Sequence, residues 1–457
     1  EGTYMAKKNS GLRVGGYIVR PLGLVLIGIL VVALIAVGVM LIIRLVGSSY
    51  EPDVTQQKPV VAVVTQTPDV NPAALQETPA PTPAVTPTPA PTPVPTPSLR
   101  SATIRSLGEI AVMPNLLDSS RTETSYDFTP MFDYIQDVVG NADFTVGDIE
   151  GPMDTRPESA FSGKDPMNTP PQIMLAMRSA GVDMLTLAND HALDMLFDGL
   201  LKTIENCKQA GGSGGMKYAG AAASQAEKDS PNIVEINGIN VAFLNYTSTL
   251  NGKEKSSSSD ALKFGVNLVT KSSNVKADVQ KAREAGADVV IAYASWGDML
   301  SAKPNEEQEM MSKAMVAAGV DVIIGFNPHT VQPAYWLPGK LDDGTPHKTL
   351  CLLATGNFLS DVRKEGFDCG LIFEFTIQET EDGKFEIANP VYVPTWVWRY
   401  EKEGGSGYEY RVLAVGEWLE ERPDGMSDAD YARLKAVWTE VQDAMSKGNA
   451  GAKALAN

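Results

Sequence analysis

Four amphipathic segments, each ending in glycine, constrain the fold of this 457-residue chain more than any other feature. Glycine is the usual residue just after a helix, so we expect helices over 170–181, 198–211, 274–286 and 306–319. Short apolar runs have the length and composition of buried strands, and they lie at 182–188, 239–246, 287–296 and 320–326. In three cases such a run follows a predicted helix within a few residues. Repeated units of this kind predict a layered α/β sandwich.

The C-terminal part of the chain follows a different pattern. Residues 371–378 and 384–400 alternate between apolar and polar side chains around a turn, "EDGK", as antiparallel strands do. Residues 427–447 predict a helix that begins at Ser427 or Asp428, both of which are good N-cap residues. We expect the last segment, 448–457, to be frayed.

An uncharged apolar stretch near the start of the chain, Leu22 to Ile43, predicts a transmembrane anchor. As a helix it would extend roughly 33 Å, enough to cross the hydrocarbon core of a bilayer. Basic residues dominate the segment before it, which places residues 1–21 in the cytoplasm and everything after 43 outside the cell. A cleaved signal peptide is the alternative, but its apolar region would be shorter, at about 7 to 15 residues. We therefore expect a single-pass protein of the cell membrane.

Proline recurs at every second or third position in the middle of the segment between 52 and 97. This spacing excludes helices and sheets and favours extended polyproline II, so we expect residues 44–100 to form an extracellular linker. A disordered tether of no particular length is the alternative. The predicted organisation continues with an α/β domain over 101–400 and a C-terminal extension over 401–457 that carries the terminal helix.

Charge and cysteine content exclude several classes of function. The net charge of −18 argues against nucleic acid as a partner, because phosphate backbones require a basic face. The three cysteines are too few and too scattered for a disulfide framework or a zinc ribbon. Cys351 and Cys369 have the potential to bridge, but we expect free, buried thiols.

Polar residues follow the predicted strands at five places, where the loops of α/β proteins carry their chemistry. Each motif alone also has an ordinary structural explanation, such as a surface acid or a capped loop histidine. Five of them in order, each at a strand end, favour one shared pocket. The motifs are Gly108-Glu109, Asp148-Ile149-Glu150-Gly151-Pro152, Leu187-Ala188-Asn189-Asp190-His191 with Asp194, Ser295-Trp296-Gly297, and Gly325-Phe326-Asn327-Pro328-His329 with Gln332.

In this order the motifs resemble the CapA family of capsule and poly-γ-glutamate synthesis proteins, over about residues 102 to 400. The stretch "LLATGNFLSD" at 352–361 is also similar to the family. The resemblance implies a fold of the calcineurin-type metallophosphatase class and a two-metal site. It also implies that the partners are the membrane, other capsule or poly-γ-glutamate synthesis subunits, and an anionic surface polymer.

The chain departs from the family pattern at the implied metal ligands. The pattern has aspartate at Glu109, asparagine at Asp190, and histidine at both Ser295 and Asn327. Loss of two imidazoles leaves an oxygen-rich set, which favours Mn, Mg or Ca over Zn. A site without metal is the alternative. In that case the cluster of Glu109, Glu150 and Asp190 should raise at least one carboxyl pKa by repulsion, and His191 should pair with a carboxylate.

These considerations give a set of candidate site residues and two functions. The candidate metal ligands are Glu109, Glu150, Asp190, Asn327 and His329; the catalytic candidates are Asp190 and His191; the candidate substrate contacts are Asn189, Ser295 and Trp296. The first function is a membrane-anchored, extracellular, non-catalytic or weakly catalytic component of capsule or poly-γ-glutamate biosynthesis or export. The alternative is an extracellular metal-dependent hydrolase of phosphoester or polymer amide bonds, with His191 as general acid.

Overall fold

The computed structural model describes residues 12–14, 17–19, 99–210, 215–269 and 272–456. The chain forms two units, Glu1–Thr92 and Pro93–Asn457. Within the first unit, β1 (Leu12–Val14) and β2 (Tyr17–Val19) pair antiparallel. The predicted membrane span over 22–43 and the proline-rich segment lie outside the described residues. Among the helices that the structure describes, none is both long enough and apolar enough to cross a bilayer.

Two sheets form the centre of the second unit, and both contain a run of parallel strands. The larger sheet has the order β17-β16-β15-β3-β5-β6-β7 along its main path, and the smaller has the order β12-β13-β11-β10-β9-β8. The larger comprises β3 (Ser101–Ser106), β5 (Phe144–Asp148), β6 (Met184–Thr186), β7 (Lys217–Ala219), β15 (Cys369–Glu379), β16 (Phe385–Glu401) and β17 (Tyr408–Ala414). The smaller comprises β8 (Ile233–Ile236), β9 (Ile239–Thr247), β10 (Val289–Ser295), β11 (Val322–Phe326), β12 (Val331–Lys340) and β13 (Pro346–Thr355). Strands β3, β5, β6 and β7 run parallel to one another, as do β9, β10, β11 and β13.

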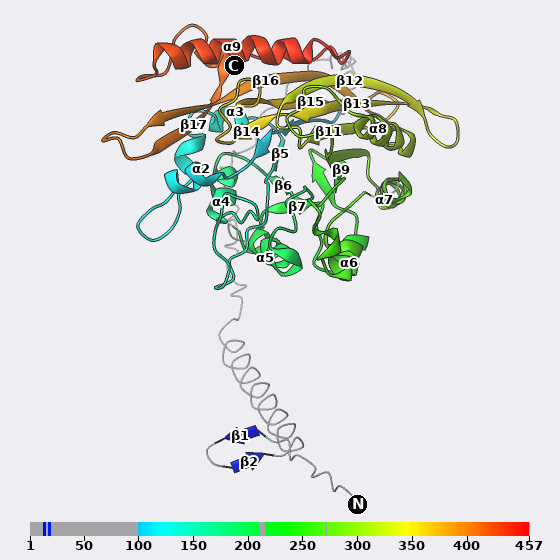
Figure 1. Cartoon of the computed structure of the whole chain (residues 1–457). Helices are drawn as coiled ribbons and strands as arrows, with labels where there is room; N and C mark the ends of the chain where they lie inside the picture. The colour runs from blue at the N-terminus through cyan, green and yellow to red at the C-terminus, as the bar shows by residue number, and fades with distance from the viewer. Residues whose placement is uncertain (1–11, 15–16, 20–98, 211–214, 270–271, 457) are drawn as a thin grey trace, which may run out of the picture. The chain divides into compact units, whose positions relative to one another are not determined.

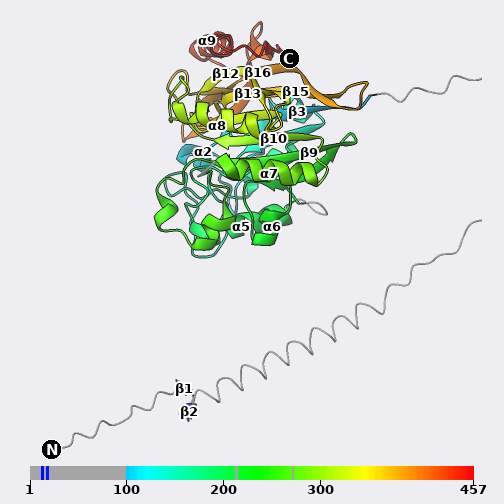
Figure 2. The ribbon, with the colours of Figure 1, turned by 90° about the vertical axis from the view of Figure 1, so that its right-hand side faces the viewer.

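Helices cover the outer faces of both sheets, so the predicted layered α/β sandwich is confirmed (Figures 1 and 2). One apolar core fills the space between the sheets. A second core lies between the larger sheet and its helices, and a third lies between the smaller sheet and its helices. The helices are α2 (Pro114–Ser119), η1 (Thr129–Phe132), α3 (Gln136–Gly140), α4 (Gln172–Ser179), α5 (Leu196–Gln209), α6 (Gln225–Asp229), η2 (Lys253–Lys255), η3 (Ala261–Gly265), α7 (Ser272–Glu284), α8 (Glu306–Ala318), η4 (Val415–Trp418) and α9 (Asp428–Met445). All four helices predicted from terminal glycines are present.

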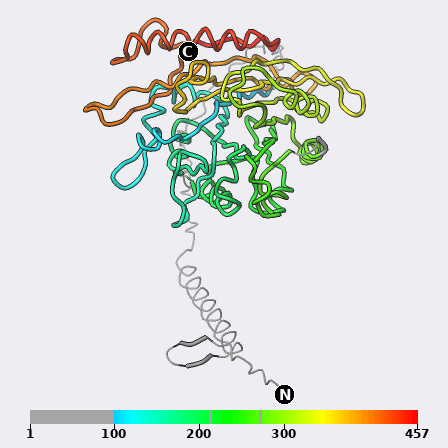
Figure 3. The backbone as a smooth tube through the Cα atoms, viewed as in Figure 1, coloured from blue at the N-terminus to red at the C-terminus, as the bar shows by residue number. Residues whose placement is uncertain are grey.

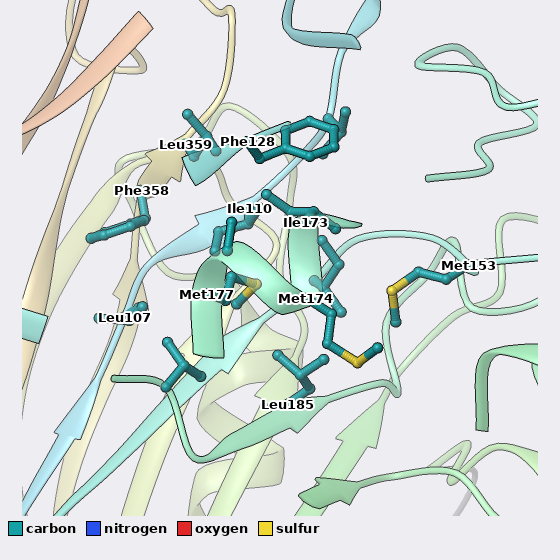
Figure 4. Packing of buried hydrophobic residues seen from close by; sticks show 14 of the residues in the cluster. Leu107, Ile110, Phe128, Met153, Ile173, Met174, Met177, Leu185, Phe358 and Leu359 are labelled. Atoms are coloured by element: carbon teal, nitrogen blue, oxygen red, sulfur yellow. The ribbon is translucent and has the colours of Figure 1, made fainter. Parts of the chain in front are cut away.

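A short parallel pair, β4 (Glu109–Ile110) with β14 (Asn357–Leu359), holds the first acidic motif against the larger sheet. Figure 4 shows Ile110, Phe358 and Leu359 packed with the methionines of α4. Gly108 is required here, because a Cβ at this position would lie 2.4 Å from the Gly356 carbonyl oxygen. Apolar burial on one side of the pair therefore fixes the position of Glu109 on the other.

The C-terminal segment is an integral part of the same core. Strands β15 and β16 pair antiparallel, and Ser427 caps α9 by accepting a hydrogen bond from Asp430 N, both as predicted. Figure 3 shows α9 lying beside strands that are distant from it in the sequence. The prediction of a frayed end is wrong, because β18 (Lys453–Ala454) pairs with β16 and Ala450 is buried.

We predict that Arg433 attaches α9 to the sheets. Its guanidinium donates to both oxygens of the buried Asp368, at 2.9 and 2.7 Å. Replacing Arg433 by Met leaves that carboxylate buried, with the Trp396 indole N–H as its only side-chain donor within the described part of the chain, so stability should fall by about 3 kcal/mol. Urea unfolding measures this loss. Arg422→Met, which breaks an exposed pair with Asp428, is the matched control and should cost less than about 1 kcal/mol.

Candidate metal centre

The carboxyl ends of the parallel strands bring the predicted motifs together from both sheets. Glu150 follows β5, Asp190 and His191 follow β6, and His329 follows β11. Glu109 joins them because β4 lies against β14, whose Asn357 is its partner in register. One ligand atom each from Glu109, Glu150 and His329 lies within 4.8 Å of the others, and all three residues are buried.

Glu109 and Glu150 are fixed by backbone contacts as well as by burial. The Glu109 backbone N–H donates to the Gly356 carbonyl, and the Glu150 N–H donates to the Ile110 carbonyl, both at 2.9 Å. Glu109 is 1% exposed and Glu150 is 5% exposed. The two carboxylates are therefore held close together in a region with little access to water.

His329 contributes a cationic group to this acidic cluster. Its Nδ1 lies 3.3 Å from Glu109 Oε2, 3.6 Å from Glu150 Oε1 and 3.1 Å from the amide oxygen of Asn357. The Asn357 amide group donates to the Phe367 carbonyl at 2.8 Å, which fixes its orientation. His329 also has a left-handed backbone with φ of +54°. This geometry keeps the imidazole within contact distance of both acids.

A second group forms around His191, beside the first. His191 Nδ1 lies 2.8 Å from Asp194 Oδ2, and Nε2 lies 3.8 Å from Asp190 Oδ2. Asp194 also accepts a hydrogen bond from the Met167 N–H at 2.7 Å, which positions its carboxylate. The exposed Asp165 brings a carboxylate oxygen within 4.8 Å of the ligand atoms of His191 and Asp194. The expected pairing of His191 with a carboxylate is present.

The other candidate residues take different positions. The Asn189 amide donates to the Ile149 carbonyl at 2.8 Å and so connects the loops after β5 and β6. Ser295 is the last residue of β10 and is buried. Trp296 is fully buried, and its indole donates to the Leu353 carbonyl at 2.9 Å. Its observed contribution is packing, and its contact with substrate stays a prediction.

Asn327 lies beside the acidic cluster but directs its side chain elsewhere. Its amide group donates to the Gly297 carbonyl at 3.0 Å, and its backbone φ is +93°. The amide therefore connects the loops after β10 and β11. A role for Asn327 as a metal ligand also stays a prediction.

Sequence reasoning omitted three residues from the site. Asp148 is the last residue of β5 and lies two positions before Glu150. Thr186 donates to one of its carboxylate oxygens at 2.7 Å, and the other oxygen has no hydrogen-bond partner among the residues that the structure describes. The spacing of Asp194, three residues after His191, was a usable signal for their pairing. Asn251 donates to Asp190 at 2.8 Å from a distant loop, and no local pattern in the sequence indicates this contact.

Burial dominates the electrostatics of the acidic cluster. It raises the pKa of Glu109 to about 6 and that of Glu150 to about 7, although the charge of His329 opposes both shifts. It also raises the pKa of Asp148 well above its ordinary value. Raised carboxyl pKa values were expected, but from mutual repulsion; the structure shows that loss of hydration is the larger cause and repulsion the smaller one.

The two histidines show the opposite balance. Burial lowers the pKa of His329, but the charges of Glu109 and Glu150 raise it. The charges outweigh burial, and the pKa of His329 rises to about 9. For His191, burial is likewise outweighed by the hydrogen bond to Asp194 and the charges of Asp190 and Glu150, and the pKa rises to about 9. Both imidazoles therefore carry positive charge at neutral pH, which partly compensates the negative charge of the acidic cluster.

We predict that the metal-free protein loses stability as pH rises from about 4.5 to 7. Over this window the folded protein keeps a proton on Glu150 that the unfolded chain releases, so unfolding becomes more favourable with pH. One such proton contributes at most about 1.4 kcal/mol per pH unit. Urea unfolding in EDTA across this range should give a shallower decline for Glu150→Gln. Glu381→Gln, in an exposed turn, should keep the original slope, and equal slopes for all three proteins would contradict the prediction.

A family model for sequences described as bacterial capsule synthesis protein PGA_cap matches residues 103–362. The chain is similar to the capsule biosynthesis protein CapA of Bacillus anthracis, at 30% identity over 47% of this chain and 50% of that protein. It is also similar to the PGA biosynthesis protein CapA of Bacillus subtilis (strain 168), at 23% identity over 56% of this chain and 63% of that protein. The chain thus spans about half to two thirds of the length of these relatives.

Two solved structures align with most of the chain at low sequence identity. The NAD nucleotidase of Haemophilus influenzae aligns over 79% of this chain and 65% of its own, with 10% identity and a TM-score of 0.40. The calcineurin-like phosphoesterase YfkN of Bacillus subtilis aligns over 77% of this chain and 99% of its own, with 14% identity and a TM-score of 0.40.

Proposed function

Because this chain belongs to the family of bacterial capsule synthesis proteins, we propose that it binds one divalent cation in an extracellular step of capsule or poly-γ-glutamate biosynthesis or export. Its contribution there is non-catalytic or weakly catalytic. The observation that carries the proposal is the convergence of Glu109, Glu150 and His329 in one buried cluster.

The residues of the cluster suit a cation. Buried carboxylates are costly unless they are paired or coordinate a metal, and Asp148 adds a buried oxygen that has no hydrogen-bond partner among the residues described. Glu109, Glu150 and His329 would hold the ion, with Asp190 as a further candidate ligand. A bound cation would supply positive charge for the carboxylate or phosphate oxygens of an anionic polymer.

The donor set favours Mn, Mg or Ca over Zn. Three of the named groups offer carboxylate oxygens and one offers an imidazole, whereas zinc sites are rich in nitrogen and sulfur ligands. The family pattern has histidine at two positions that are Ser295 and Asn327 in this chain. The Asn327 amide donates to a backbone carbonyl, that of Gly297. This loss of imidazoles supports one cation in place of a two-metal site, and hence weak or no catalysis.

Sequence features support a position at the cell surface. The apolar stretch 22–43 is long enough for a single-pass anchor, and the basic residues before it favour a cytoplasmic N-terminus. The proline-rich linker would then hold the α/β domain away from the membrane, close to other synthesis subunits and the nascent polymer. Because the whole chain has a net charge of −18, the protein would need the cation to attract an anionic polymer.

We predict that the protein binds one Mn²⁺ and that Glu150→Gln weakens the binding at least tenfold. Removing one charge from the buried ligand set lowers both the attraction for the ion and the quality of the ligand. Calorimetric titration at pH 7.5 measures stoichiometry and affinity, with Glu381→Gln as the control of equal charge change. Absence of Mn²⁺ binding by the unaltered protein would exclude the proposed cation site.

A second candidate function, metal-dependent hydrolysis, is favoured by the geometry of His191. Asp194 holds its Nδ1 at 2.8 Å, so Nε2 is the nitrogen left to face the site. An imidazole oriented in this way can act as general acid at the leaving oxygen of a phosphoester or at the nitrogen of an amide. The hydrolase would act on the polymer or on a phosphoester outside the cell.

The double change Ser295→His with Asn327→His separates the two candidates. It introduces one imidazole at the end of β10 and one in the loop after β11, so we predict tighter Mn²⁺ or Zn²⁺ binding that strengthens between pH 5 and 7 as the imidazoles lose their protons. Titration calorimetry and phosphodiester turnover measure both properties. Because the change removes the Asn327 to Gly297 hydrogen bond, Asn327→Ala serves as the control. Turnover by the unaltered protein would favour the hydrolase.

A further inference from the structure

A tight turn at residues 250–253 forms part of the wall of the site. The Lys253 N–H donates to the Leu250 carbonyl at 2.9 Å, and Asn251 and Gly252 have φ of +50° and +77°. Two positive φ values in the centre of such a turn define type I′, for which Asn-Gly is the preferred pair. Leu250 is fully buried, and its N–H donates to Glu254 at 2.9 Å. The turn is therefore anchored firmly on both sides of Asn251.

Asn251 connects this turn to the candidate site. Its side-chain amide donates to Asp190 Oδ2 at 2.8 Å, and the same oxygen lies 3.8 Å from His191 Nε2. Asp190 is 5% exposed, so few water molecules can replace this donor. The amide thus competes with His191 for one carboxylate oxygen. Without it, Asp190 would be free to rotate toward His191 and away from the cation.

We infer that Asn251 is a positioning residue for the cation site, acting through Asp190. This inference rests on the proposed function. Hydrogen-bond partners of metal-ligating carboxylates orient those ligands, and their loss typically weakens metal binding 10- to 100-fold. The rigid type I′ turn makes the amide a preorganised donor, because little conformational freedom is lost when it meets the carboxylate.

The chain offers a matched control at the opposite end of β9. Asn237 and Gly238 form the turn between β8 and β9, with φ of +50° and +77°. The Asn237 amide also makes one hydrogen bond, to the Ser101 carbonyl at 3.0 Å. Replacing either asparagine by alanine therefore removes one side-chain hydrogen bond and the same preference for a left-handed backbone. The two asparagines differ in their partner: the Asn251 amide donates to Asp190, and the Asn237 amide donates to the Ser101 carbonyl.

Calorimetric titration of the full chain with MnCl₂ tests the inference through a double-mutant cycle. We expect Asn251→Ala to weaken Mn²⁺ binding about tenfold, and Asn237→Ala to change it less than twofold. In an Asp190→Ala background the effect of Asn251→Ala should fall below twofold, because the residue through which it acts is gone. Thermal unfolding should show similar shifts for the two asparagine variants.

Each other outcome decides against the inference. Equal Mn²⁺ affinity in the Asn251→Ala and Asn237→Ala proteins would show that the amide does not support the site. A tenfold loss that persists in the Asp190→Ala background would show that Asn251 acts by another route. If the unaltered chain binds no Mn²⁺, the proposed function fails, and this inference fails with it.

Discussion

The burial of several carboxylates at the meeting edge of two sheets is the constraint on which the site depends. Glu109, Asp148, Glu150 and Asp190 are each no more than 5% exposed. A cluster of this kind persists only where the surrounding fold holds it in place and positive charge compensates it. His329 supplies part of that charge from the loop after β11. The apolar cores therefore stabilise an arrangement that is electrostatically unfavourable on its own.

The sequence predicted the parts of the fold that depend on local pattern. Terminal glycines marked α4, α5, α7 and α8, and apolar runs marked the strands next to them. Because parallel strands end at one edge of a sheet, the polar motifs after these strands could be placed in one region without knowledge of the contacts. Glu109, Glu150 and His329 were identified in this way, and the structure brings their ligand atoms together.

Other features depend on contacts between distant segments, and the sequence does not encode these in a periodic pattern. Asn251 reaches Asp190 from a turn 61 residues away. The last residues of the chain read as a frayed end, yet Leu455 N donates to the Tyr392 carbonyl at 2.8 Å, because β16 offers a free edge there. Trp296 was named as a candidate substrate contact, and its fully buried indole donates to the carbonyl of Leu353, 57 residues away. In each case the tertiary partner decides the position, and local composition does not reveal it.

The departures from the family pattern share one physical direction. The imidazoles that the pattern implies at positions 295 and 327 are absent, whereas Glu109 keeps a carboxylate, Asp190 adds one and Glu150 is unchanged. At position 327 the amide donates to the Gly297 carbonyl and so connects the loops after β10 and β11. A site that loses nitrogen ligands while keeping buried acids becomes a poorer clamp for two transition metals and a better one for a single hard cation.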